Sequence, residues 1–192
     1  MSEAGTQQIV DDGEPAAAGR SFAERLVGAL RLDGSVYEEV ANDPRALAHA
    51  AGVVACVAAA HAIGVSSSTT PMRAGLDAVA AFGFWLVTAA LVWSVGKVLR
   101  YPGDFGRVLR AVGFAMSPLI LVALILVPNE WIRAGVLLVT YALLFGAFVV
   151  GVRPALRVDT GRAAFICILV ALIFFFVGLV ALYAAHQMGG TS

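Results

Sequence analysis

Residues 163–184 read AAFICILVALIFFFVGLVALYA, an apolar segment without a charged side chain. At about 1.5 Å of rise per helical residue, this segment can cross a hydrocarbon core roughly 30 Å thick. Its bulky side chains lie all around the helix, so we expect much of its surface to face lipid. The segment therefore indicates an integral membrane protein.

Four more apolar segments precede this one, and we expect five transmembrane helices at about residues 46–65, 75–97, 109–127, 131–152 and 163–184. The composition agrees, because 60% of the 192 residues are hydrophobic and only 14% are charged. Soluble domains have about 45–50% apolar and about 25% charged residues. The predicted fold is an all-α, polytopic membrane bundle over residues 44–185, followed by a short exterior tail at 186–192.

The chain before the first span divides into two parts. Residues 1–20 are acidic and poor in core-forming side chains, which predicts a disordered tail. Residues 21–24 (SFAE) and 35–38 (SVYE) match the capping-box pattern, so residues 21–43 predict two short amphipathic helices. Asp43-Pro44 then predicts the start of the first span. The short helices have two open roles, packing at the membrane surface or under the bundle, and docking a partner.

Small residues and prolines shape the predicted packing. The first span has two rows of small residues at a spacing of four, which predicts close packing inside the bundle. These rows are Ala48, Gly52, Cys56, Ala60 and Gly64, and Ala51, Ala55 and Ala59. Pro118 is expected to bend the third span, and Arg153-Pro154 to end the fourth.

The basic residues predict the orientation. With five spans, eleven of the 13 Lys and Arg residues fall on the side of the N-terminus, and only Arg73 and Arg133 on the other side. Cytoplasmic loops carry an excess of Lys and Arg. We therefore expect a multi-pass protein of the cell membrane with a cytoplasmic N-terminus and an exterior C-terminus.

Ionisable residues in or near the spans are the candidate site residues, because burying them in lipid is costly. His61, Arg73 and Asp77 are expected near the outer membrane surface, where they form either a polar ligand-binding cluster or three separately solvated groups. Four residues are expected at the inner surface, in contact with lipid headgroups or setting the topology. They are Arg45, His49, Arg107 and Arg110.

Several function classes receive no support. No catalytic triad, carboxylate pair, phosphate-binding glycine loop or HExxH pattern is present, so we predict a protein that is not an enzyme. Cys56 and Cys167 lie alone in apolar segments, and no metal or cofactor site is predicted. The zero net charge argues against nucleic acid as a partner.

One motif resembles a known family. Residues 107–119 (RVLRAVGFAMSPL) contain Gly113-Phe114 and Pro118, similar to the Gly-aromatic-x-x-x-Pro signature of the third span in Yip1-domain proteins. The Asp-Pro before the first span, the five spans and the short tail resemble the same family over residues 22–185. The resemblance implies a structural role for Gly113, Phe114 and Pro118. Composition suggests a prokaryotic-type member.

The resemblance also implies a function. Eukaryotic Yip1-type proteins act in vesicle traffic and bind Rab-type GTPases, but they carry an Asp-Leu-x-Gly-Pro element where this chain has only Asn42-Asp43-Pro44. Binding of a Rab-type GTPase is therefore not carried over. The expected function is non-enzymatic membrane organisation, trafficking or scaffolding of other membrane proteins, with lipid and other membrane proteins or a second copy as partners. The alternative is a small transporter or channel.

Overall fold

The computed structural model describes residues 19–65, 70–126 and 129–189, and these residues form an all-helical fold. Most of the predicted N-terminal tail lies outside the described residues. The helices are α1 (Phe22–Leu30), α2 (Gly34–Asn42), α3 (Ala46–Val65), α4 (Pro71–Val98), α5 (Phe105–Ala115), the 3-10 helix η1 (Ser117–Leu126), α6 (Glu130–Leu156) and α7 (Thr160–Gly189). Five segments in this part of the chain are long and apolar enough to cross a membrane, which confirms the predicted fold class.

Capping residues set the starts of α1 and α2. The capping box before α1 is present: the backbone N–H of Ser21 donates to Glu24 Oε2 at 2.7 Å, and Glu24 N–H donates to Ser21 Oγ. The second predicted capping box is wrong. Asp33 caps α2 instead and accepts a hydrogen bond from Ser35 N–H at 2.9 Å. Because Asp33 lies two residues before Ser35, α2 begins at Gly34, earlier than a cap at Ser35 would allow.

The third span, α5 followed by η1, is the most buried of the five. We compared an apolar stretch of 18 residues from each span. The buried share of these residues is 56% in the third span (residues 105–126), 44% in α3 and 17% in α7. Within the bundle, α5 and η1 contact both α3 and α6. The packing centre is therefore the third span together with α3.

The small-residue rows of α3 lie mostly at the edge of the packed face. Ala48 and Cys56 are exposed, and the buried face instead carries Ala50, Val53 and Val54. Gly64 does make a close helix contact, because a Cβ at this position would clash with the backbone carbonyl of Val122 in η1. In the same row, a Cβ on Gly52 would lie 3.3 Å from the ring of Phe22 in α1, so the closest approach to another span is at Gly64.

The two span prolines have different effects. At Pro118 the α-helix does not continue: α5 ends at Ala115, and the chain proceeds as the 3-10 helix η1. This agrees with the loss of one backbone donor inside a span. Pro154 does not end α6, contrary to the prediction, because the helix continues to Leu156. Pro154 lies in the last turn, where one missing N–H costs little continuity, and Arg157 ends the helix with a φ of 54°.

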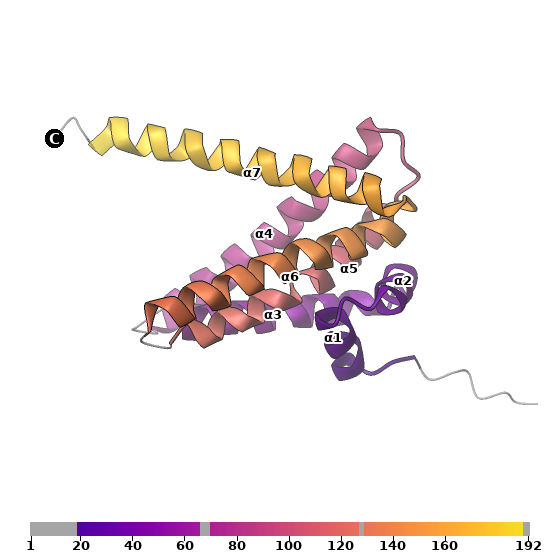
Figure 1. The fold of residues 1–192 in the computed structure, drawn as a ribbon, viewed down its shortest axis with the longest axis horizontal. Coiled ribbons are helices and arrows are strands. Elements are labelled where there is room, and N and C mark those ends of the chain that lie inside the picture. Colours follow the sequence, from indigo (N-terminus) through magenta and orange to yellow (C-terminus); the bar gives the residue numbers. More distant parts are fainter. Residues whose placement is uncertain (1–18, 66–69, 127–128, 190–192) are drawn as a thin grey trace, which may run out of the picture.

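The helix α7 diverges from the other spans along its length. It contacts α4 and α6, and Figure 1 shows its yellow C-terminal half leaving the bundle. Its buried residues are Ala163, Ile166, Cys167 and Val170, all in the first half of the helix. The second half is exposed, as its bulky composition predicts.

Candidate functional site

His61, Arg73 and Asp77 lie around two cavities that share Asp77 as a lining residue. His61 of α3 and Asp77 of α4 line one cavity of about 220 Å³, whose other lining residues are Val57, Ala80, Ala81, Phe84, Met116 and Leu119. Arg73, one helical turn before Asp77, lines a second cavity of about 470 Å³ that also includes Asp77. The structure therefore brings the three predicted residues to one place. Between them, the described residues show no hydrogen bond and no ion pair.

Asp77 has an unusual environment within this cluster. Its Oδ2 atom is buried and has no hydrogen-bond partner in the described part of the chain. A buried carboxylate oxygen normally accepts hydrogen bonds, because losing its water is unfavourable without them. The arrangement can accept a hydrogen-bond donor or a positive charge.

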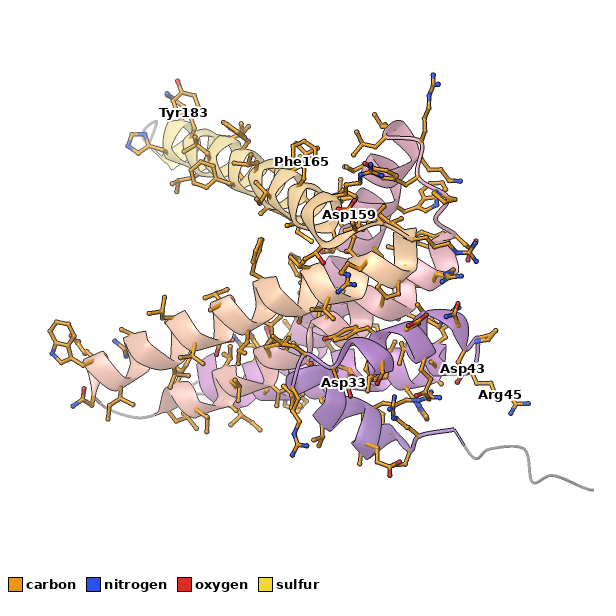
Figure 2. All side chains as sticks on the ribbon, turned by 45° about the vertical axis from the view of Figure 1, so that its right-hand side comes forward. Asp33, Asp43, Arg45, Asp159, Phe165 and Tyr183 are labelled. Carbon is orange, nitrogen blue, oxygen red and sulfur yellow. The ribbon has the colours of Figure 1, made fainter. Side chains whose placement is uncertain are left out.

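At the start of α3, Arg45 and His49 have different surroundings. Arg45 is exposed, and its backbone N–H donates to Asp43 Oδ1 at 2.9 Å. Figure 2 shows the side chains of Asp43 and Arg45 at the same end of the molecule. His49 is half-buried, with its Nδ1 3.2 Å from Arg25 Nη1 and its ring edge-on to Phe22. Arg45 is thus exposed at the surface of the bundle, whereas His49 packs against α1.

Arg107 and Arg110 contact backbone carbonyls of other helices. Arg110 is buried and donates from Nε to the carbonyl of Val40 at 3.1 Å and from Nη2 to that of Ala41 at 2.6 Å. Arg107 Nη2 donates to the carbonyl of Pro154 at 3.0 Å. The last carbonyls of a helix lack partners within the helix and lie at the negative end of its dipole. The two arginines therefore cap the C-terminal ends of α2 and α6.

The signature glycine marks the closest approach of three helices. A Cβ on Gly113 would lie 2.8 Å from the Cβ of Ala50 in α3 and 3.1 Å from Nε1 of Trp85 in α4. The indole N–H of Trp85 donates to the carbonyl of Leu109 at 2.8 Å, one turn before Gly113. Only a residue without a side chain lets the indole lie on α5 and reach that carbonyl. Phe114 and Pro118 are both buried.

A family comparison agrees with the resemblance that the sequence motif indicated. The Yip1 domain matches residues 28–182, which is most of the chain. The protein belongs to the Yip1-domain family. Gly113, Phe114 and Pro118 lie within the matched range. No curated protein and no solved structure shows a significant match to the chain.

The sequence analysis of this Yip1-domain protein missed a buried polar network around Arg25. Arg25 is 4% exposed and forms ion pairs with Glu39 at 2.9 Å and Asp43 at 2.7 Å. The spacing of Phe22, Arg25 and Ala29 is that of a single helix face, which was the available signal. Desolvation raises the pKa of Asp43, but the hydrogen bonds from the Arg25 side chain and the Arg45 N–H, together with the positive charges of both arginines, outweigh it, and the pKa lies below its ordinary value.

An apolar groove between α4, α6 and α7 was also missed, because it depends on how far α7 diverges. It has a volume of about 250 Å³. Its lining residues are Phe84, Thr88, Tyr141, Leu144, Phe145, Phe148, Val170, Ala171 and Phe174. Thr88 Oγ1 is buried and lacks a hydrogen-bond partner among the described residues. The groove offers aromatic surface and one unused hydroxyl.

Proposed function

We propose that this Yip1-domain protein is a non-enzymatic membrane organiser that holds a transmembrane helix of another membrane protein in the groove between α4, α6 and α7. The observation that supports this most directly is the divergence of α7, which packs on the bundle only through its first half. A span that separates from its neighbours leaves side chains on both walls available to another helix.

The groove has the chemistry that such a helix needs. Helices associate in lipid through close van der Waals contact and occasional hydrogen bonds, because apolar burial alone gives little driving force there. Phe145, Phe148 and Phe174 provide contact area, and Thr88 provides a hydroxyl. The polar residues Arg25, Arg107 and Arg110 hold helices together, which also supports a structural rather than a catalytic role.

We further propose that the protein lies in the cell membrane with α1 and α2 in the cytoplasm. The support is the distribution of charge, since eleven of the 13 basic residues belong to the side of the N-terminus. In Figure 1, α1 and α2 lie at the end of the molecule opposite the end of α7. An exterior C-terminus follows from this orientation.

Photocrosslinking in native membranes tests the scaffold role. A photoreactive residue at Phe145, in the groove, is expected to give one discrete adduct, whereas the same residue at Phe176, exposed but not in the groove lining, is not. The partner should then co-purify reciprocally, and its distribution in the membrane should change when this protein is deleted. Equal adducts at both positions, or adducts with lipid only, would refute the proposal. An adduct with a second copy of this protein would show that the groove serves self-association and does not hold a different membrane protein.

A transporter is the second candidate, because the cavity of about 220 Å³ contacts both His61 and Asp77. Next to this cavity, however, the bundle is filled by apolar residues, including Val53, Val54 and Trp85. Transport therefore requires these helices to separate. Flux of a solute or of protons into liposomes containing the purified protein, abolished by Asp77→Asn, would favour the transporter over the scaffold.

A further inference from the structure

The outer end of α4 contains a carboxylate with no partner. Asp77 lies in the second turn of α4, inside a segment apolar enough to span the membrane. Its Oδ2 is buried and receives no hydrogen bond from the described residues. A carboxylate at this depth normally pairs with a cation or a hydrogen-bond donor, because lipid and apolar side chains cannot replace its water.

The neighbouring polar residues do not provide that partner. His61 lines the smaller cavity and Arg73 the larger one, each together with Asp77, yet neither makes an ion pair or hydrogen bond with Asp77 within the described part of the chain. Arg73 is exposed, although the spacing of four residues places it on the same helix face as Asp77. Arg73 and Asp77 thus lie on one face of α4 without forming an ion pair.

The two cavities have different character and meet at Asp77. The smaller one, between α3, α4 and the third span, has an apolar lining apart from His61 and Asp77. The larger one, at the start of α4, is lined by Thr70, Met72, Arg73, Leu76 and Asp77. A ligand that fits both carries a positive group, a negative group and an apolar chain next to one another.

We infer that these cavities form one binding site for an aminophospholipid. Its primary ammonium group donates to Asp77, its phosphate lies by the guanidinium of Arg73, and the start of an acyl chain enters the smaller, apolar cavity. This inference does not depend on the scaffold role.

The ammonium group makes the site selective. A primary ammonium carries N–H donors that a buried carboxylate oxygen can accept, whereas the quaternary ammonium of phosphatidylcholine has none, and phosphatidylglycerol has no cation. A hydrogen bond to a charged group contributes about 1.5–3 kcal/mol, which corresponds to about tenfold or more in the dissociation constant. We therefore expect phosphatidylethanolamine to bind about tenfold more tightly than phosphatidylcholine of the same acyl chains.

Native mass spectrometry of the full chain, released from detergent micelles containing one added phospholipid, measures this preference. Asp77→Asn is expected to remove the roughly tenfold preference for phosphatidylethanolamine over phosphatidylcholine. Glu130→Gln is the matched control, because Glu130 is an exposed carboxylate in the first turn of another span, and it should retain the preference. Arg73→Gln, at an exposed position, should weaken the binding of phosphatidylethanolamine and phosphatidylglycerol alike while the preference over phosphatidylcholine remains.

Each alternative result has a defined meaning. Equal binding of phosphatidylethanolamine and phosphatidylcholine by the wild-type protein would overturn the assignment, and so would an unchanged preference in Asp77→Asn. If Asp77→Asn does not fold, unaltered lipid binding in Arg73→Gln would overturn the placement of the phosphate. Displacement of the lipid by free phosphoethanolamine at equal concentration would overturn the acyl-chain contact, and would identify a soluble amine as the ligand of Asp77.

Discussion

A single methyl group added at Gly113 should destabilise the bundle. In Gly113→Ala, the new Cβ would lie 2.8 Å from the Cβ of Ala50 and 3.1 Å from Trp85 Nε1. A contact of 2.8 Å between two carbon atoms is far inside their optimal separation of about 3.5–4.0 Å. Because Ala50 is fully buried on α3, the helices or the indole must move.

The net effect combines three contributions. Overpacking a tight interior costs about 1–3 kcal/mol. Displacing the indole breaks its hydrogen bond to the Leu109 carbonyl, which costs about 1 kcal/mol. Alanine favours a helix over glycine by about 1 kcal/mol, which offsets that loss. We therefore expect Gly113→Ala to lower the free energy of unfolding by about 1–3 kcal/mol.

The measurement is unfolding of the purified protein in detergent, followed by the fluorescence of its tryptophans. Gly135→Ala in α6 is the matched control: no atom lies within 4 Å of its added Cβ, so stability should stay the same or rise by up to about 1 kcal/mol. Adding Ala50→Gly to Gly113→Ala removes the closest contact and should restore part of the loss. If Gly113→Ala is as stable as Gly135→Ala, the reasoning about this three-helix contact is wrong.

Three further predictions concern other contacts. Arg25→Gln should lower the free energy of opening of α1 and α2, measured by hydrogen exchange, by about 1–3 kcal/mol, because it leaves Glu39 and Asp43 without their shared cation. The control Arg45→Gln should leave this free energy unchanged. Since the pKa of Asp43 lies below its ordinary value of 3.8, this stabilisation is present above pH 3.8 and is lost as the pH falls through the lowered pKa. Arg25→Gln should reduce that loss in acid, because only the contribution of Arg45 to the lowered pKa would remain. Gly64→Ala should cost about 2 kcal/mol in detergent unfolding because the rigid Val122 carbonyl blocks the new Cβ, whereas Gly83→Ala, with no atom within 4 Å, should be neutral. A tag after Ser192 should be labelled on intact cells, given the uneven charge of the loops, and labelling only after permeabilisation would contradict the proposed orientation.

The spans could be predicted because lipid requires length and apolar composition, and both are properties of one segment alone. The ends of helices were predicted less well. Ser21 and Glu24 cap α1 as expected, but Asp33 replaces Ser35 as the cap of α2. Pro154 stays helical because a proline in the last turn loses few hydrogen bonds, which depends on where Arg157 ends the helix.

The site residues show what a single sequence does not contain. Residues His61, Arg73 and Asp77 were found because charge near a span is rare, and the structure brings them together. Arg110 has the same signal, yet its guanidinium contacts the carbonyls of Val40 and Ala41, about seventy positions earlier in the chain. The sequence shows that such an arginine needs a partner, but the choice between a lipid phosphate and a helix end depends on tertiary packing.

These contacts make α5 one of the elements that connect the N-terminal helices to the membrane bundle, together with α6, on which α2 also packs. On one side, Gly113 lets α5 contact α3 and α4 directly. One turn before it, Arg110 holds the end of α2, and Arg107 holds the end of α6. Because α1 is joined to α2 through Arg25 and Glu39, a partner that moves α1 or α2 also acts on α5. The same helix carries Gly113 and Phe114 of the family signature, so the signature marks the joint between the N-terminal helices and the spans.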